Sequence, residues 1–184
     1  MICGAMNTKS SCLELWEVFA RTPLEMSEAF TIMTSFAFAL KDLHSSNELW
    51  DHCEKGVLIY ESCLVEITGT LSNRHLRLKG SDVDPYRSIA PPEFIISGIH
   101  DVRSDIFAWG IISYELITGI CPVYGENITE IMNNALRCDF LNPCLLREEC
   151  PEKLSDLVMK SISKNPDDRF QTTENLIEMI NKPL

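Results

Sequence analysis

The chain has 184 residues, of which 45% are hydrophobic, and this is enough for one sizeable core, so we expect a single domain over residues 1–184. Acidic residues outnumber basic ones by 27 to 16, which gives a net charge of −11. Such a charge argues against binding to nucleic acid or to an anionic membrane and favours a basic protein partner. No signal peptide and no membrane-length apolar run is visible, so we expect a cytoplasmic protein without membrane insertion.

The first third of the chain reads as helical. A short helix is predicted over residues 11–21, and Pro23 ends it. A long helix is predicted over residues 22–46, with Thr22 as its cap and Pro23 in its first turn. Because apolar residues continue almost all round this second helix, we expect it to be buried.

The middle of the chain changes to short β-branched and apolar runs. Residues 56–67 and 75–80 are predicted to form a small hairpin, with a turn over 68–73 between them. A loop over 83–94 follows. The rest reads as helices, at 105–116, 128–138, 152–163 and 173–180. The fold class predicted is therefore mainly α, with a short β-hairpin.

Asp105 stands directly before the apolar run IFAWGIISYELI, at the mouth of a helix that must be buried. The start of such a helix leaves backbone N–H groups unpaired, and a carboxylate there meets the positive end of the helix dipole. Asp105 can also accept hydrogen bonds from a neighbouring loop. Alternatively, Ser104 caps the helix and Asp105 is only solvated in its first turn.

Three segments in order resemble motifs of the C-terminal lobe of protein kinases. APPEF resembles the Ala-Pro-Glu motif, with Pro91, Pro92 and Glu93. SDIFAWGIISYELITG resembles the F helix with its Asp-x-x-x-x-Gly pattern, and NPDDRF resembles the segment that carries an arginine before the last helix. The resemblance implies a kinase-like C-lobe fold without the N-lobe, because no glycine-rich loop and no V-A-I-K lysine occur.

The same resemblance implies structural roles for four residues. Asp105 is expected to hold the backbone of the catalytic loop, with Gly110 completing the F-helix pattern. Glu93 and Arg169 are expected to form a buried ion pair across the lobe.

The catalytic pattern H-R-D-x-x-x-x-N is not readable at the expected place. Aligning CLV with the usual apolar triplet puts Val57 at the catalytic aspartate and Ser62 at the metal-binding asparagine. Gly80 then stands at the magnesium-binding aspartate of D-F-G. Phosphoryl transfer needs these groups, so the expectation is a chain that is not an enzyme and uses no cofactor.

Metal ligands are also not expected from the sequence. The eight cysteines are scattered without a CxxC pair, and reduced thiols are expected. The four histidines are widely spread, and none makes a metal pair: His44, His52, His75 and His100.

A kinase lobe without catalytic residues resembles the kinase non-catalytic C-lobe (KIND) family of protein-binding modules, and residues 12–43 resemble its opening helices. Three hypotheses remain open. The chain is an interaction module of this type acting as a scaffold or regulator, a C-lobe fragment or isoform of a pseudokinase or protein kinase, or an active kinase whose N-lobe is supplied elsewhere. For the first, the expected partner is a protein with a basic segment, steered by exposed acids: Glu148, Glu149, Asp167 and Asp168.

Overall fold

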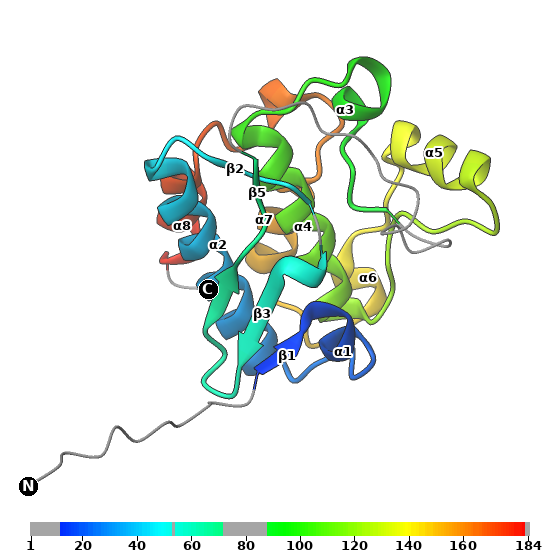
Figure 1. Cartoon of the computed structure of the whole chain (residues 1–184). Helices are drawn as coiled ribbons and strands as arrows, with labels where there is room; N and C mark the ends of the chain where they lie inside the picture. Colours follow the sequence, from blue (N-terminus) through cyan, green and yellow to red (C-terminus); the bar gives the residue numbers. More distant parts are fainter. Residues whose placement is uncertain (1–11, 53, 72–87, 183–184) are drawn as a thin grey trace, which may run out of the picture.

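The structure is a computed structural model that describes residues 12–52, 54–71 and 88–182. It confirms the predicted fold class, since helices dominate and the sheets are small and antiparallel (Figure 1). The elements follow the chain as β1 (Cys12–Glu14), α1 (Leu15–Phe19), α2 (Met26–Ser45), β2 (Leu49–Trp50), η1 (Glu54–Gly56), β3 (Val57–Tyr60), β4 (Val65–Ile67), β5 (Thr70–Leu71), α3 (Pro92–Ser97), α4 (Val102–Thr118), α5 (Ile128–Arg137), α6 (Pro143–Leu146), α7 (Glu152–Ser161), η2 (Pro166–Asp168) and α8 (Thr173–Ile180).

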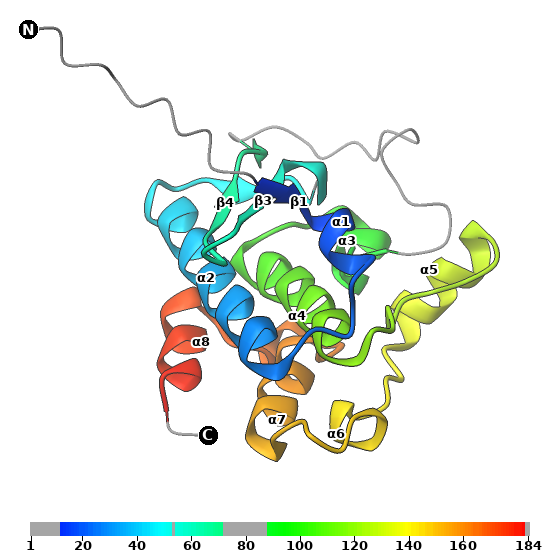
Figure 2. The same cartoon turned by 90° about the horizontal axis from the view of Figure 1, so that it is seen from below.

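Helix α4 is the centre of the lobe, with α2 on one side and α7 on the other (Figures 1 and 2). Every residue of α4 from Ser104 to Ile117 is buried, as expected from the apolar run in its sequence. Its cap differs from the prediction. Asp101 is the N-cap residue, and its side chain accepts a hydrogen bond from the backbone N–H of Arg103. Ser104 completes this capping box instead of capping the helix itself.

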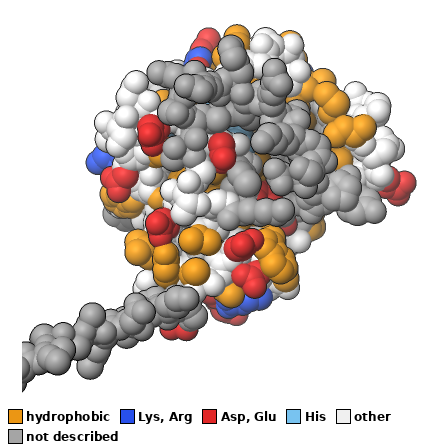
Figure 3. All heavy atoms as spheres, viewed as in Figure 1, with side chains coloured by type: hydrophobic (Ala, Val, Ile, Leu, Met, Phe, Trp, Pro, Cys, Tyr) orange, Lys and Arg blue, Asp and Glu red, His pale blue; other side chains and the backbone are white. Residues whose placement is uncertain are grey.

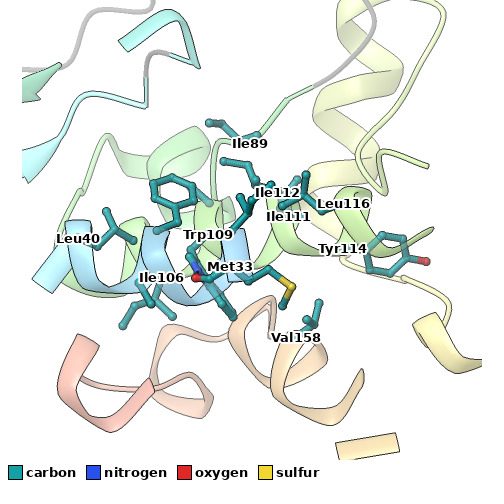
Figure 4. Packing of buried hydrophobic residues seen from close by; sticks show 14 of the residues in the cluster. Met33, Leu40, Ile89, Ile106, Trp109, Ile111, Ile112, Tyr114, Leu116 and Val158 are labelled. Carbon is teal, nitrogen blue, oxygen red and sulfur yellow. Dashed lines mark hydrogen bonds between the residues drawn. The ribbon is translucent and has the colours of Figure 1, made fainter. Parts of the chain in front are cut away.

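The contact between α2 and α4 carries much of the core. Trp109 lies between the helices, and its indole Nε1 donates a hydrogen bond of 2.9 Å to the backbone oxygen of Met33 (Figure 4). Leu40 and Ile106 pack beside this pair, and Val158 of α7 closes the core from the other side (Figure 4). The prediction that the long helix is buried holds for seven of its residues, which form the face turned to α4 and α8.

The long helix begins later than predicted, at Met26. Leu24 donates its backbone N–H to the oxygen of Leu116, which is one of the carbonyls left unpaired at the end of α4. This bond keeps residues 22–25 running across the end of α4, so they cannot wind into the helix. Thr22 does not cap α2, because the N-cap residue is Glu25, and the Thr22 hydroxyl donates to the backbone oxygen of Phe19.

The strands pair differently from the prediction. The hairpin is β3–β4, and its turn lies within residues 61–64, where Cys63 has a left-handed φ of 60°. The strand predicted over 75–80 lies outside the described residues. Cys12–Glu14, predicted as helix, instead pairs with β3 as the strand β1, and β2 pairs with β5 in a separate two-stranded sheet. The second pairing places the loop after β2 beside the start of α4.

The later helices match their predicted positions within two or three residues, apart from two short helices that were not predicted. Helices α3 and α6 have a proline in their first turn, a position where the missing N–H costs nothing. Across the residues that the structure describes, no helix has both the length and the hydropathy required to cross a membrane.

Candidate functional site

Asp105 lies in the first turn of α4 with its side chain fully buried. Its Oδ2 accepts a hydrogen bond of 3.0 Å from the backbone N–H of Trp50, at the end of β2. The carboxylate therefore holds the backbone of another segment, which is the first of the two roles that the sequence left open. Trp50 is itself fully buried and packs edge-on against Phe36, with 5.4 Å between ring centroids.

Three histidine side chains converge on the same carboxylate. The Nε2 atoms of His52 and His100 lie 2.9 Å and 2.7 Å from Oδ1 of Asp105. The Nε2 atom of His44 lies 2.8 Å from Oδ2. We call these four residues the histidine–aspartate cluster. Its histidines come from the end of α2, the loop after β2 and the loop before α4, so their wide sequence spacing hid this contact.

Burial and hydrogen bonding set the charges of this cluster. Burial alone would raise the pKa of Asp105, but the hydrogen bonds from His100, His44 and His52 outweigh it and hold that pKa well below its usual range. Burial lowers the pKa of His52, against the opposing hydrogen bond to Asp105. Asp105 is therefore a carboxylate at neutral pH, and His52 is a neutral imidazole.

The segment held by Asp105 corrects the alignment of the catalytic pattern. Its next residue is Asp51, a carboxylate, and the pattern D-x-x-x-x-N counted from Asp51 ends at Gly56, directly before β3. Val57, which the sequence placed at the catalytic aspartate, is instead a buried residue of β3. The error arose because the apolar triplet CLV was aligned where VLI belongs.

The two other predicted degenerate positions do not lie in the loop held by Asp105. Ser62 lies exposed in the β3–β4 turn, away from the held loop, and Gly80 lies outside the described residues. Asp51 lies instead against Gly69, where a Cβ atom would be 2.8 Å from the carboxylate carbon. The backbone N–H of Asp51 also donates to the oxygen of Gly69, at 3.4 Å.

Glu93 and Arg169 are brought together across the lobe. Nη1 and Nη2 of Arg169 each donate a hydrogen bond of 2.8 Å to the Glu93 carboxylate. The Arg169 side chain is fully buried and also donates to the backbone oxygens of Ser163, Arg103 and Lys164. The pair joins α3 to the segment before α8, and the Ser104 hydroxyl ties it to α4 by donating to Glu93.

Gly110 lies where α4 crosses α7. A Cβ atom on Gly110 would lie 2.5 Å from Cγ2 of Ile162 and 3.0 Å from Cβ of Ser161. The glycine is therefore required by the close approach of the two segments and contacts nothing that suggests chemistry.

The four predicted partner-contact acids are all exposed but do not form one patch. Asp167, beside Asp168 in η2, pairs with Arg103 at the start of α4. Glu149, beside Glu148, pairs with Arg147, which binds the backbone oxygen of Ile117 near the end of α4. Fourteen residues of helix separate Arg103 from Ile117, a distance of about 20 Å.

Comparison with known proteins assigns the class of this lobe. Residues 8–180 match the family model described as protein tyrosine and serine/threonine kinase, and the chain belongs to this family.

Named relatives agree with the family. The chain is 25% identical over 165 residues to the serine/threonine-protein kinase PrkC of Bacillus subtilis, covering 86% of this chain and 25% of that protein. It is 28% identical over 165 residues to the probable serine/threonine-protein kinase kinX of Dictyostelium discoideum, covering 88% of this chain and 14% of that protein. Over 74 residues it is 36% identical to the tyrosine-protein kinase MasK of Myxococcus xanthus, covering 40% of this chain and 12% of that protein. The chain thus spans a quarter or less of each of these relatives.

The prediction that the chain is not an enzyme is wrong. Its relatives are named serine/threonine- and tyrosine-protein kinases, and its family is a kinase family. The argument for catalytic loss rested on Val57, Ser62 and Gly80, and the loop held by Asp105 does not contain them.

Proposed function

We propose that this chain supplies the C-terminal lobe of a longer protein kinase and that Asp51 acts on the protein acceptor. The observation that carries the proposal is the hydrogen bond from the Trp50 backbone to Asp105, because it fixes the loop in which Asp51 is the next residue. In phosphoryl transfer, a carboxylate in such a loop accepts the proton of the substrate hydroxyl. The identity and coverage of the relatives support the assignment to a larger kinase.

Magnesium and ATP are implied by the family, and the described residues of this loop do not fit the magnesium part of the pattern. Magnesium requires oxygen ligands, whereas Gly56 stands at the asparagine position and has no side chain. A Cβ atom there would lie 3.0 Å from the backbone nitrogen of Gly69, so an asparagine would require the backbone at Gly69 to shift. The proposed role of Asp51 is therefore limited to orienting and deprotonating the acceptor hydroxyl.

The test is a phosphate-transfer assay on the longest natural form of the protein, with radiolabelled ATP and a mixture of acidic and basic acceptor proteins. Asp51→Asn keeps the size of the side chain and removes the base, so we expect transfer to fall by about 10²–10⁴-fold. Asp42→Asn, an exposed aspartate on α2, is the matched control and should transfer normally. Transfer by Asp51→Asn at the unmodified rate, or no transfer by the unmodified protein, would contradict the role of Asp51.

A second role, binding of a protein partner, is supported by exposed apolar side chains. Trp16 on α1 and Leu64 in the β3–β4 turn are 56% and 58% exposed. Figure 3 shows hydrophobic side chains in the lower part of the molecule, where Figure 1 places α1, β1 and β3. Large exposed apolar groups often mark interaction sites, and this is the role that the KIND resemblance suggests.

The net charge favours a basic segment as that partner. Because the predicted acids lie at the two ends of α4, only the Glu148 and Glu149 pair is proposed to steer one short segment. The test measures association of lysine-rich peptides at low and high salt. Charge reversal at both glutamates should slow the association, and an association rate unaffected by salt would contradict the steering.

A further inference from the structure

The histidine–aspartate cluster gathers three imidazoles around one buried carboxylate. Its three imidazoles and one carboxylate are each more than nine-tenths buried, with side-chain exposures of 8%, 6%, 7% and 0% for His44, His52, His100 and Asp105. Within the described residues, Nδ1 of His52 and Nδ1 of His100 have no hydrogen-bond partner. In this part of the chain the two atoms face no hydrogen-bonding protein group, so each ring is held through its Nε2 atom alone.

The donor set points to a particular kind of ligand. Imidazole nitrogens together with one carboxylate oxygen suit zinc and neighbouring transition metals, whereas magnesium and calcium prefer oxygen donors alone. His52, His100 and Asp105 each offer a ligand atom, and these atoms lie within 4.8 Å of one another. Within the described residues, it is the one group of at least three histidine, cysteine or acidic side chains whose ligand atoms come this close together.

The spacing is close to what coordination needs. Zinc bonds of about 2.0–2.1 Å to nitrogen and oxygen separate neighbouring tetrahedral ligands by about 3.3 Å. The two Nε2 atoms now lie 2.9 Å and 2.7 Å from Oδ1 of Asp105, at hydrogen-bond distance. An ion between them would lengthen these two distances by about half an ångström. The ligand atoms of the two rings, which lie within 4.8 Å of each other, would also have to settle at about 3.3 Å, and rotation of the rings can supply both changes.

The electrostatic balance also favours a cation. Asp105 carries a buried negative charge, and its ion pairs among the described residues are all to histidines. The charge of Asp51 also acts on His52. A divalent cation bound to Asp105 and two neutral imidazoles would be offset by these two carboxylates. The remaining proton of each ligating ring would then lie on Nδ1, since a neutral imidazole holds one proton.

We propose that His52, His100 and Asp105 bind a transition-metal ion of the zinc type, and that this ion fastens the loop after β2 to the start of α4. His44 and the backbone N–H of Trp50 remain on Oδ2 of Asp105 and orient the carboxylate from behind. The ion has a structural role, because Asp105 is buried and lies behind the loop that carries Asp51. The site does not depend on phosphate transfer, so it can be tested separately from the proposed function.

The experiment uses the full 184-residue chain, stripped of metal with a chelator and titrated with Co²⁺ and then Zn²⁺. We expect one Co²⁺ per chain with the visible absorption of a tetrahedral ion, displaced by Zn²⁺. X-ray absorption of the zinc form should show only nitrogen and oxygen neighbours with imidazole scattering. This measurement uses the unmodified chain, so it remains decisive even if a variant fails to fold.

Two variants locate the ligands. His52→Gln and His100→Gln each keep an amide N–H group that can donate to Asp105, and each should weaken zinc binding by more than about tenfold. Cys144→Ser is the control for adventitious binding to thiols, because Cys144 lies close to Cys150, and it should bind zinc normally. Circular dichroism of the metal-free variants checks their folding.

Three results would overturn the proposal. They are the absence of stoichiometric binding at micromolar free zinc, sulfur among the zinc neighbours, and folded histidine variants that bind zinc as the unmodified chain does. In the first case the cluster is held by hydrogen bonds alone, and in the second the zinc is bound by cysteines.

Discussion

Replacing Arg169 by alanine should destabilise the lobe severely, because this side chain is fully buried and makes five hydrogen bonds. Two of them go to Glu93, three go to backbone oxygens, and the guanidinium also lies 4.6 Å from the ring centroid of Phe107. Removing one partner of a buried ion pair typically costs about 3–5 kcal/mol. For a chain of this length, each kcal/mol lowers the melting temperature by about 2–4 °C, so Arg169→Ala should melt about 6–20 °C below the unmodified protein.

The two side chains of this ion pair differ in their exposure to water, and this difference predicts the effect of removing Glu93 instead. Glu93 is 14% exposed in its side chain, whereas Arg169 is not exposed at all. Water can reach the carboxylate that Arg169→Ala leaves behind, but it reaches the stranded guanidinium of Glu93→Ala less easily. Glu93→Ala should therefore be at least as destabilising as Arg169→Ala, although it removes fewer hydrogen bonds.

Urea denaturation followed by circular dichroism measures the free energy of unfolding for each variant. The matched control is Arg21→Ala, which breaks an exposed ion pair with Glu28 and should cost less than about 1 kcal/mol. The reasoning is refuted if Arg169→Ala and Arg21→Ala have the same unfolding free energy.

Three further predictions follow from the site. Gly110→Ala should cost about 1–3 kcal/mol despite the higher helix propensity of alanine, and adding Ile162→Ala should recover part of it in a double-mutant cycle, because Ile162 is what the new methyl group meets. Asp105→Ala should speed hydrogen exchange at the Trp50 amide, since the side-chain oxygen that accepts this N–H is lost. Although burial would raise the pKa of Glu93, Arg169 holds it below the usual value, so its contribution to stability is present above about pH 4.5 and is lost as the pH falls through the folded pKa. Urea midpoints of Glu93→Gln should therefore fall less steeply below pH 4.5 than those of the unmodified protein.

The helical part of the fold was readable from the sequence because its signals are local. The buried helix around Trp109 contains a long apolar run, and α8 was predicted with its observed bounds. The errors occurred where a contact with a segment distant in the sequence determines the secondary structure. Residues 22–25 stay out of α2 because Leu24 binds the end of α4, and residues 12–14 form a strand because β3 lies beside them.

The candidate site shows the same division between local and distant information. Glu93, Asp105 and Arg169 were found because each stands in a short motif with a fixed neighbour pattern. The partner that Asp105 holds was not found, because the segment 49–52 has no such pattern and the apolar runs before and after Tyr60 offered two alignments. A count backward from the correct apolar run, Val57–Ile59, would have given Asp51 at the spacing of the kinase pattern.

The histidines show why residue spacing is a poor guide to buried clusters. His44 and His52 are separated by a turn and a short strand, and His100 comes from a segment far along the chain. What unites them is Asp105, whose two oxygens accept from all three rings and from Trp50. A fully buried carboxylate needs several donors to remain ionised, and only one of these four comes from the backbone. The excess of imidazoles over what a helix start requires is the feature that points beyond a cap, toward an ion shared by the loop and α4.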